Sequence, residues 1–208
     1  MLSQEKALKI LEECGLPQGI VDHSKAVSKR AGEIAGEIEE VDEKQLKIAG
    51  LLHDIGKARC IGNGNDKPIS EHSIESKKML EEIDQNNLAE ICEKHSFRIL
   101  AKKDLDEYSL EDKILIISDM QTKGSEKVSL EKRYEDLLSR YPNDSESLKK
   151  ALPKLKKIRS ELESTMMKRG KGNKLDIEYN MVDFHEEQTL HRRIAGKLRT
   201  GEHSRSYY

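Results

Sequence analysis

The stretch Leu51-Leu52-His53-Asp54-Ile55-Gly56-Lys57 places a histidine and an aspartate side by side at the end of an apolar segment. Neutral imidazole and carboxylate are both good ligands for a divalent metal ion. Burying such a polar pair is costly unless the pair binds something. The alternative is an ordinary helix C-terminus, with Gly56 as a left-handed cap and His53 hydrogen-bonded to a carbonyl oxygen. The rest of the chain decides between these two interpretations.

The composition of the chain fits one ordinary domain with an appendage, because the chain has 208 residues. Its 37 Lys and Arg nearly balance 39 Asp and Glu, so we expect neither a nucleic-acid partner nor an anionic membrane. Aromatic residues make up 4%, which disfavours a platform for stacked bases. The three cysteines are widely spaced and no apolar run is long enough to span a membrane. We therefore expect a cytoplasmic protein with reduced thiols.

Apolar residues recur at helical spacing along most of the chain, and strand-like alternation is rare. The expected helices cover residues 3–14, 20–39, 43–54, 71–83, 87–95, 109–122, 129–140 and 145–168. Gly50 lies within the third of these, where it could permit close helix packing. Pro153 should kink the last one or mark its true start. The pattern predicts an all-α protein: a compact bundle of about six or seven helices over 1–140, a C-terminal helical extension over 141–170 and a tail over 171–208.

The tail carries two weaker patterns. Residues 175–182 alternate between apolar and polar side chains, which indicates a short strand that could add to the sheet of a partner. Residues 190–198 have the spacing of a last amphipathic helix. From Thr200 onward the sequence is typical of disorder.

Four of the seven histidines fall in the buried register of an expected helix or at its inner end. Taken singly, each is more simply a core histidine bonded to a backbone carbonyl. An aspartate that follows a long apolar run, as Asp119 does, is paired, is a ligand or lies at the mouth of the core. Repetition of this placement on five helices favours convergence of six side chains on one polar cavity: His23, His53, Asp54, His72, His95 and Asp119.

The order of these six residues resembles the fuller, two-metal signature of the HD-domain superfamily of metal-dependent phosphohydrolases. Residues 53–56 match its HDIG mark, and Ser118-Asp119-Met120 resembles its closing aspartate motif. The resemblance covers about residues 18–140 and implies an HD-type metal-binding domain over 1–140. Within the superfamily, the chain is similar to the small stand-alone branch that includes bacterial diadenosine-tetraphosphate hydrolases. The cyclic-dinucleotide branch usually has two adjacent histidines, whereas Ser96 follows His95 here.

The resemblance also implies the ligands of two metal ions. One ion would be held by His23, His53, Asp54 and Asp119, and the second by Asp54, His72 and His95. Asp54 would bridge the two. Imidazoles with few carboxylates favour a divalent transition metal over Mg or Ca, with Fe or Mn expected first and Zn, Co or Ni as alternatives. Such ions lower the pKa of a bound water, which then attacks phosphorus.

Basic residues near this set are candidates for binding phosphate. Lys57 could reach a substrate phosphate as a point charge, or it could be a solvated lysine near a helix C-terminus. For Arg98, Lys102 and Arg133 a surface position is the favoured interpretation. Three further histidines lack partners at ligand spacing and are interpreted as surface residues: His185, His191 and His203.

The expected function is hydrolysis of a phosphoester or phosphoanhydride in a nucleotide or another small phosphorylated metabolite, with Asp54 and Lys57 as catalytic residues. Two alternatives stay open: a di-iron oxygenase of the same fold, and a nucleotide-sensing regulatory module that keeps the metal pocket. We expect no nucleic-acid or membrane partner, and residues 141–200 could form a homodimer.

Overall fold

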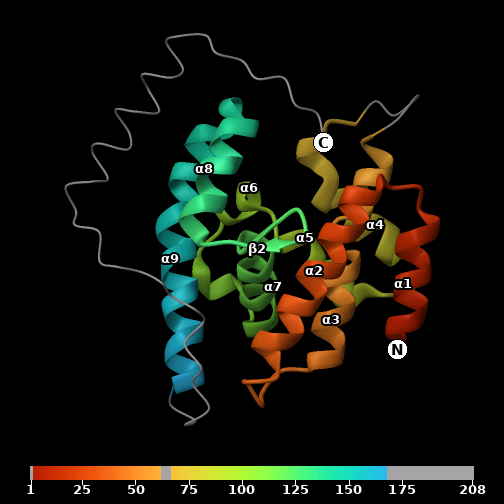
Figure 1. The fold of residues 1–208 in the computed structure, drawn as a ribbon, viewed down its shortest axis with the longest axis horizontal. Helices are drawn as coiled ribbons and strands as arrows, with labels where there is room; N and C mark the ends of the chain where they lie inside the picture. The colour runs from red at the N-terminus through yellow and green to blue at the C-terminus, as the bar shows by residue number, and fades with distance from the viewer. Residues whose placement is uncertain (1, 62–66, 168–208) are drawn as a thin grey trace. The chain divides into compact units, whose positions relative to one another are not determined.

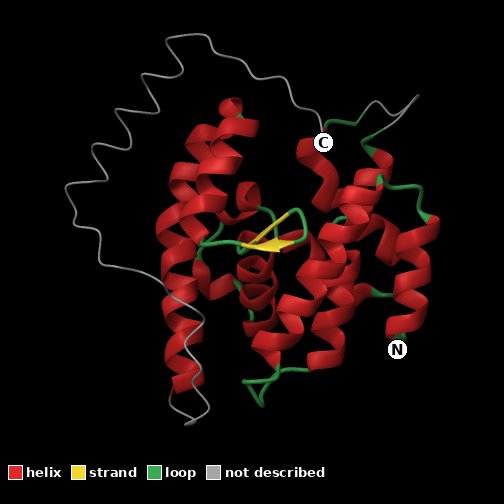
Figure 2. Ribbon diagram, viewed as in Figure 1, coloured by secondary structure: helices red, strands yellow, loops and turns green. Residues whose placement is uncertain are grey.

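The computed structural model describes residues 2–61 and 67–167, which all belong to the unit Met1–Asn173. Nearly all regular structure in these residues is helical (Figure 2), so the expected all-α class is confirmed. The described α-helices are α1 (Gln4–Glu13), α2 (Gln18–Ala35), α3 (Glu43–Leu52), α4 (His72–Glu81), α5 (Asn86–Lys94), α6 (Phe97–Leu100), α7 (Leu110–Met120), α8 (Leu130–Arg140) and α9 (Ser145–Met167). The strand, helix and histidines expected beyond residue 170 lie outside the described residues.

Side chains that cap helix N-termini set where two central helices begin. Asp42 accepts hydrogen bonds from the backbone N–H groups of Lys44 and Gln45, at 2.8 and 3.1 Å, at the start of α3. Ser109 and Asp112 form a reciprocal capping box at the start of α7. These bonds satisfy N–H groups that the first turn of a helix leaves without a partner.

The helix α7 lies in the middle of the bundle and contacts α2, α3, α5 and α9 (Figure 1). Four consecutive residues of α7, from Ile114 to Ile117, are completely buried. A helix that is apolar on all sides is buried on all sides, which explains its central position. The helices α2 and α3 pack closely at Gly50, where a Cβ would lie 2.5 Å from the Cα of Ser28. The close packing expected at Gly50 is therefore confirmed.

The last described helix, α9, packs against α6, α7 and α8. Its completely buried residues are Leu148, Ala151, Leu155, Ile158 and Leu162. The helix starts at Ser145 and continues through Pro153, so the proline does not mark its start. Pro153 lies on the exposed side, where water can satisfy the carbonyl that loses its helical partner.

Two short elements were not expected, and one of them begins at Thr122, the last residue of the helix expected over 109–122. The helix α6 falls within residues 96–108, which have no helical pattern. A hairpin of β1 (Thr122–Lys123) and β2 (Glu126–Lys127) follows α7 and turns at Gly124, whose φ is +57°. Strands of two residues are too short to show alternation. Among the described residues, no helix is long and apolar enough to cross a membrane.

Candidate metal centre

The six polar residues expected to converge come from five helices and their ends. His23 is on α2, Asp119 is in the last turn of α7, and His72 begins α4. His53 and His95 are the C-cap residues of α3 and α5. Asp54 follows His53 and precedes the 3-10 helix η1 (Ile55–Arg59). The structure brings all six side chains together, in overlapping groups of three whose ligand atoms lie within 4.8 Å of one another.

The carboxylate of Asp54 lies at the centre of this group. Its Oδ2 atom is 4.0 Å from Nε2 of His23 and 3.4 Å from Nε2 of His53. Its Oδ1 atom is 3.3 Å from Nε2 of His72 and 3.7 Å from Nε2 of His95. Each oxygen therefore faces its own pair of imidazoles, which is the arrangement that a carboxylate bridging two ions requires.

Backbone carbonyls fix the orientation of all four imidazoles. Each Nδ1 lies between 2.5 and 3.0 Å from a carbonyl oxygen. The pairs are His23 with Gly124, His53 with Gly50, His72 with Ile69, and His95 with Cys92. Because a carbonyl oxygen can only accept, each Nδ1 carries a hydrogen and donates it, and a ring in this tautomer presents an Nε2 lone pair to the centre. Metal-ligating histidines are usually held in this way.

Several acceptor atoms in the centre face one another without a donor between them. The Nε2 atoms of His72 and His95 are 3.2 Å apart. Within the described chain, Nε2 of His53 and Oδ1 of Asp54 are buried and have no hydrogen-bond partner. Burial lowers the pKa of His72 to about 3, so a proton on this ring does not resolve the contact at neutral pH.

A divalent cation would satisfy these lone pairs. Ligand atoms that each lie about 2 Å from one ion are about 3 to 4 Å apart, and the nitrogen and oxygen atoms around Asp54 have this spacing. A set dominated by imidazole suits transition metals better than Mg or Ca. The donor set is thus consistent with divalent metal binding.

Both carboxylates of the cluster are ionised at neutral pH. Burial alone would raise the pKa of Asp54, but the ammonium group of Lys57 holds it well below its ordinary value. Burial likewise opposes ionisation of Asp119, but its pKa lies well below the ordinary value, and the guanidinium of Arg133 contributes to this shift. The Oδ1 atom of Asp119 lies 3.0 Å from Nε2 of His23.

Gly56 serves the site through packing and not as a left-handed cap. Its φ is not positive, so the cap interpretation is wrong. A Cβ at this position would lie 2.1 Å from the carbonyl oxygen of His72 and 2.2 Å from the amide nitrogen of Ser76. The Ser76 hydroxyl donates to the carbonyl of His53 at 2.7 Å and accepts from the N–H of Gly56 at 2.9 Å. The backbone of α4 therefore holds the segment from His53 to Gly56 in place.

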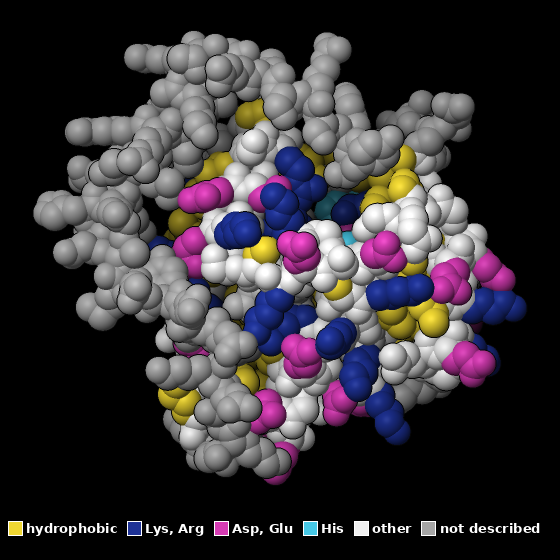
Figure 3. Space-filling model, viewed as in Figure 1, with side chains coloured by type: hydrophobic (Ala, Val, Ile, Leu, Met, Phe, Trp, Pro, Cys, Tyr) yellow, Lys and Arg dark blue, Asp and Glu magenta, His cyan; other side chains and the backbone are white. Residues whose placement is uncertain are grey.

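The cluster opens into a pocket with basic side chains at its edge (Figure 3). Lys57 pairs with Asp54, and its side chain is 19% exposed, so it is not the solvated lysine of the alternative interpretation. Arg133 lies 3.7 Å from Oδ1 of Asp119, and Arg98 hydrogen-bonds Asp144. The surface positions favoured for these two arginines are therefore wrong, since both line the pocket. Lys102 is exposed, as expected.

Two residues that line the pocket, Arg140 and Tyr141, were missed by the sequence analysis. They lie at the end of the helix expected over residues 129–140, three and four residues after the buried Leu137. Residues spaced by three or four share a helix face, so the sequence places Arg140 and Tyr141 on the same face as Leu137 and Arg133. The sequence does not show that this helix face borders the histidines, so the two residues could not be assigned to the pocket.

Comparisons with known proteins agree with this geometry. The family model of the HD domain matches residues 20–121. The uncharacterized protein MJ0778 of Methanocaldococcus jannaschii is 32% identical over 154 residues, which cover 65% of this chain and 86% of that protein. Ribonuclease Y from Listeria welshimeri is 58% identical over 41 residues, which cover 20% of this chain but 8% of that enzyme. No solved structure matches the chain. The chain belongs to the HD-domain superfamily.

Proposed function

We propose that this protein is a metal-dependent phosphohydrolase that cleaves a phosphoester or phosphoanhydride bond in a small phosphorylated compound. The proposal is carried by one observation: the two oxygens of Asp54 each face a pair of imidazole Nε2 atoms. Membership of the HD-domain superfamily supports it. In the proposed site, one ion is held by His23, His53, Asp54 and Asp119, and the other by Asp54, His72 and His95.

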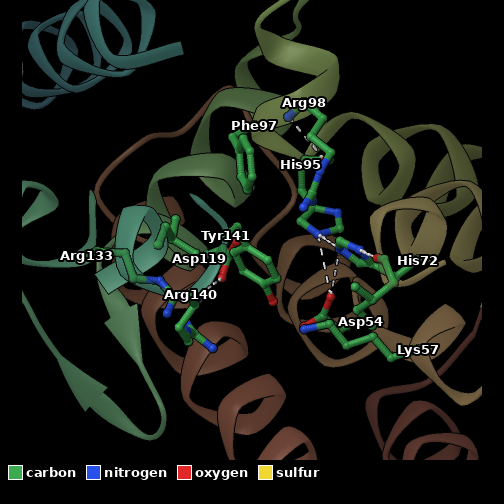
Figure 4. A pocket seen from close by; sticks show the side chains of 13 residues that line it. Asp54, Lys57, His72, His95, Phe97, Arg98, Asp119, Arg133, Arg140 and Tyr141 are labelled. Atoms are coloured by element: carbon green, nitrogen blue, oxygen red, sulfur yellow. Dashed lines mark hydrogen bonds and ion pairs between the residues drawn. The ribbon is translucent and has the colours of Figure 1, made fainter. Parts of the chain in front are cut away.

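The chemistry requires a nucleophile and a site that tolerates a growing negative charge. Bound divalent ions would supply a water of lowered pKa and would neutralise charge on the phosphoryl oxygens. Lys57 and Arg133 line the pocket on either side of the cluster (Figure 4). Fixed cations in these positions would orient a phosphate without needing to reorganise during the reaction. We assign Lys57, which pairs with Asp54, the role of binding the phosphoryl group that reacts.

Turnover of a substrate panel tests this proposal. Protein loaded with Mn²⁺ or Fe²⁺ is incubated with nucleoside mono-, di- and triphosphates, diadenosine tetraphosphate, p-nitrophenyl phosphate and a short RNA. We expect release of phosphate or nucleotide from at least one small compound, and loss of that activity in Asp54→Asn. Asp22→Asn is the control, because Asp22 is an exposed residue adjacent to His23. Absence of all turnover by protein shown to contain metal would contradict the proposal.

The same preparations separate hydrolysis from the two alternatives. Hydrolysis should continue without oxygen and with redox-silent Zn²⁺. Consumption of oxygen that occurs only with iron would instead support a di-iron oxygenase. Tight nucleotide binding without turnover by any metal form would support a sensing module.

A further inference from the structure

The wall of the pocket that faces the metal cluster comes from outside the matched domain. Its residues Arg133, Leu137 and Arg140 lie on α8, and Tyr141 is the C-cap of that helix. The HD-domain match ends at residue 121. Figure 4 shows Arg133, Arg140 and Tyr141 across the pocket from His72 and Lys57. Recognition at this wall therefore depends on the segment that follows the matched domain, together with Arg98 on α6 within it.

Three guanidinium groups that line the pocket are held by two carboxylates. Oδ2 of Asp136 accepts from Nη1 of Arg133 at 2.9 Å and from Nη2 of Arg140 at 2.6 Å. Asp144 accepts two hydrogen bonds from Arg98, at 2.9 and 2.5 Å. Asp136 also pairs with Lys123, at 2.9 Å. These two carboxylates, together with Asp119 beside Arg133, thus fix the three guanidinium groups at the edge of the pocket.

One of these arginines also has an unused donor. The side chain of Arg133 is 8% exposed, and its Nε atom has no hydrogen-bond partner among the described residues. A buried N–H group without a partner is costly. Arg133 lines the pocket, so a small shift of its side chain would present this N–H to an anionic group bound there.

The aromatic rings of the pocket are already covered by cations. The guanidinium carbon of Arg98 lies 4.5 Å from the ring centre of Phe97 and 5.2 Å from that of Tyr141. The guanidinium carbon of Arg140 lies 5.7 Å from the ring centre of Tyr141. Arginine held over an aromatic ring donates from its edge, where Asp144 and Asp136 accept some of the N–H groups and a phosphate oxygen would accept others. The wall is therefore better suited to an anion than to a stacked base.

We infer that Arg98, Arg133 and Arg140 form a subsite for a second phosphate group, beyond the one that reacts at the cluster. This inference rests on the proposed function for the position of the first phosphate. The subsite implies that the preferred substrates contain linked phosphate groups, as a nucleoside polyphosphate or an inorganic polyphosphate does. Binding of phosphonates tests it without any turnover, because a P–C–P bridge is not hydrolysed.

The test is calorimetric titration of Mn²⁺-loaded protein with methylenediphosphonate and with methylphosphonate, at a fixed concentration of free Mn²⁺. The diphosphonate should bind at least about tenfold more tightly, because each charge-assisted hydrogen bond contributes this order of affinity. Arg140→Gln should lose about tenfold in affinity for the diphosphonate and much less for methylphosphonate. The side chain of Arg140 is 44% exposed, so this variant should fold.

Lys25→Gln is the matched control, since Lys25 is 41% exposed, also forms one ion pair and lies outside the pocket lining. Equal losses for Arg140→Gln and Lys25→Gln, or equal losses for the two phosphonates, would overturn the subsite. If the diphosphonate preference is present but no compound of the substrate panel is turned over, only the proposed hydrolysis fails. If substrates with one and two phosphates are turned over with equal kcat/KM, only the subsite fails.

A nucleoside derivative separates the two sources of linked phosphates. The methylene analogue of ADP should bind within about threefold of methylenediphosphonate, because cations already cover the aromatic rings. Binding more than about a hundredfold tighter would overturn the argument that this wall recognises phosphate and not a base.

Discussion

Gly56 is required by a contact between backbones. A methyl group at this position would lie 2.1 Å from the carbonyl oxygen of His72 and 2.2 Å from the amide nitrogen of Ser76. Neither atom can move without shifting α4. Because His72 itself begins this helix, the fold and the metal cluster depend on the same glycine.

Gly56→Ala should therefore lower the free energy of unfolding by about 3 kcal/mol or more, as expected when a buried site is overpacked against backbone. The control is Gly19→Ala on α2, where a Cβ would meet nothing within 4 Å. That variant should change stability by less than about 1 kcal/mol, and in the stabilising direction. Urea denaturation measures both. Equal effects of the two substitutions would contradict the packing argument.

Ser76 links the same segment to α4 through two buried hydrogen bonds. Ser76→Ala should cost about 1 to 3 kcal/mol, because the N–H of Gly56 and the carbonyl of His53 lose their partner. Ser24→Ala is a matched control: Ser24 is completely buried, but its hydroxyl has no hydrogen-bond partner within the described residues. Removal of the Ser24 hydroxyl should leave the free energy of unfolding almost unchanged, as measured by chemical denaturation. A cost as large as that of Ser76→Ala would mean that burial, and not hydrogen bonding, sets the effect.

At the scale of single residues, the sequence predicts the histidines well and their partners poorly. His23 lies in an apolar helix register, so its burial could be predicted from spacing alone. Its carbonyl partner, Gly124, is 101 residues away in a hairpin of two-residue strands. A contact between residues so far apart in the chain cannot be predicted from the spacing of apolar residues. The role of Gly56 was likewise hidden, because it depends on packing against a helix that follows a long loop.

At the scale of elements, the hairpin after α7 orients one of the four imidazoles. It turns at Gly124, which has a φ of +57° and whose carbonyl accepts a hydrogen bond from His23. A residue with a β-branched side chain is strained in this conformation. The hairpin would have to shift to relieve the strain, and the carbonyl would shift with it.

Gly124→Val should therefore reduce both stability and the affinity for Mn²⁺, the latter by about tenfold, as for other losses of support to a metal-ligating histidine. Gly15→Val is the control, because Gly15 has a φ of +75° and equally open surroundings but follows α1, away from the cluster. It should lose similar stability while keeping its affinity for Mn²⁺. Calorimetric titration and urea denaturation separate the two effects. Equal affinities in both variants would show that the hairpin does not orient His23.

The helices could be predicted because most have a clear apolar stripe, and the all-α class followed from them. The helix α6 could not, since its four residues span about one turn. The pocket wall was missed for a different reason. The register of α8 was correct, but only the tertiary structure shows that the face bearing Arg133 and Arg140 borders the cluster.

For the whole molecule, metal binding and folding should be coupled, because the six cluster residues come from helices distributed along the bundle. A ligand that binds only the folded state, and is present at a hundred times its Kd, raises the free energy of unfolding by about 2.7 kcal/mol. For a domain of this size this corresponds to a rise in Tm of about 5 to 10 °C. We expect such a rise when Mn²⁺ is added to chelator-treated protein, and none for Asp54→Asn. An equal rise for both proteins would place the bound ion elsewhere.

The most direct test of the account is anomalous diffraction from crystals of the Mn²⁺-loaded protein. The account predicts density for manganese between Asp54 and the imidazoles, with at least one ion about 2.0 to 2.3 Å from an Asp54 oxygen and from Nε2 atoms of the cluster. Manganese density that is absent from the cluster, while the four imidazoles and two carboxylates hydrogen-bond only to one another or to water, would contradict it.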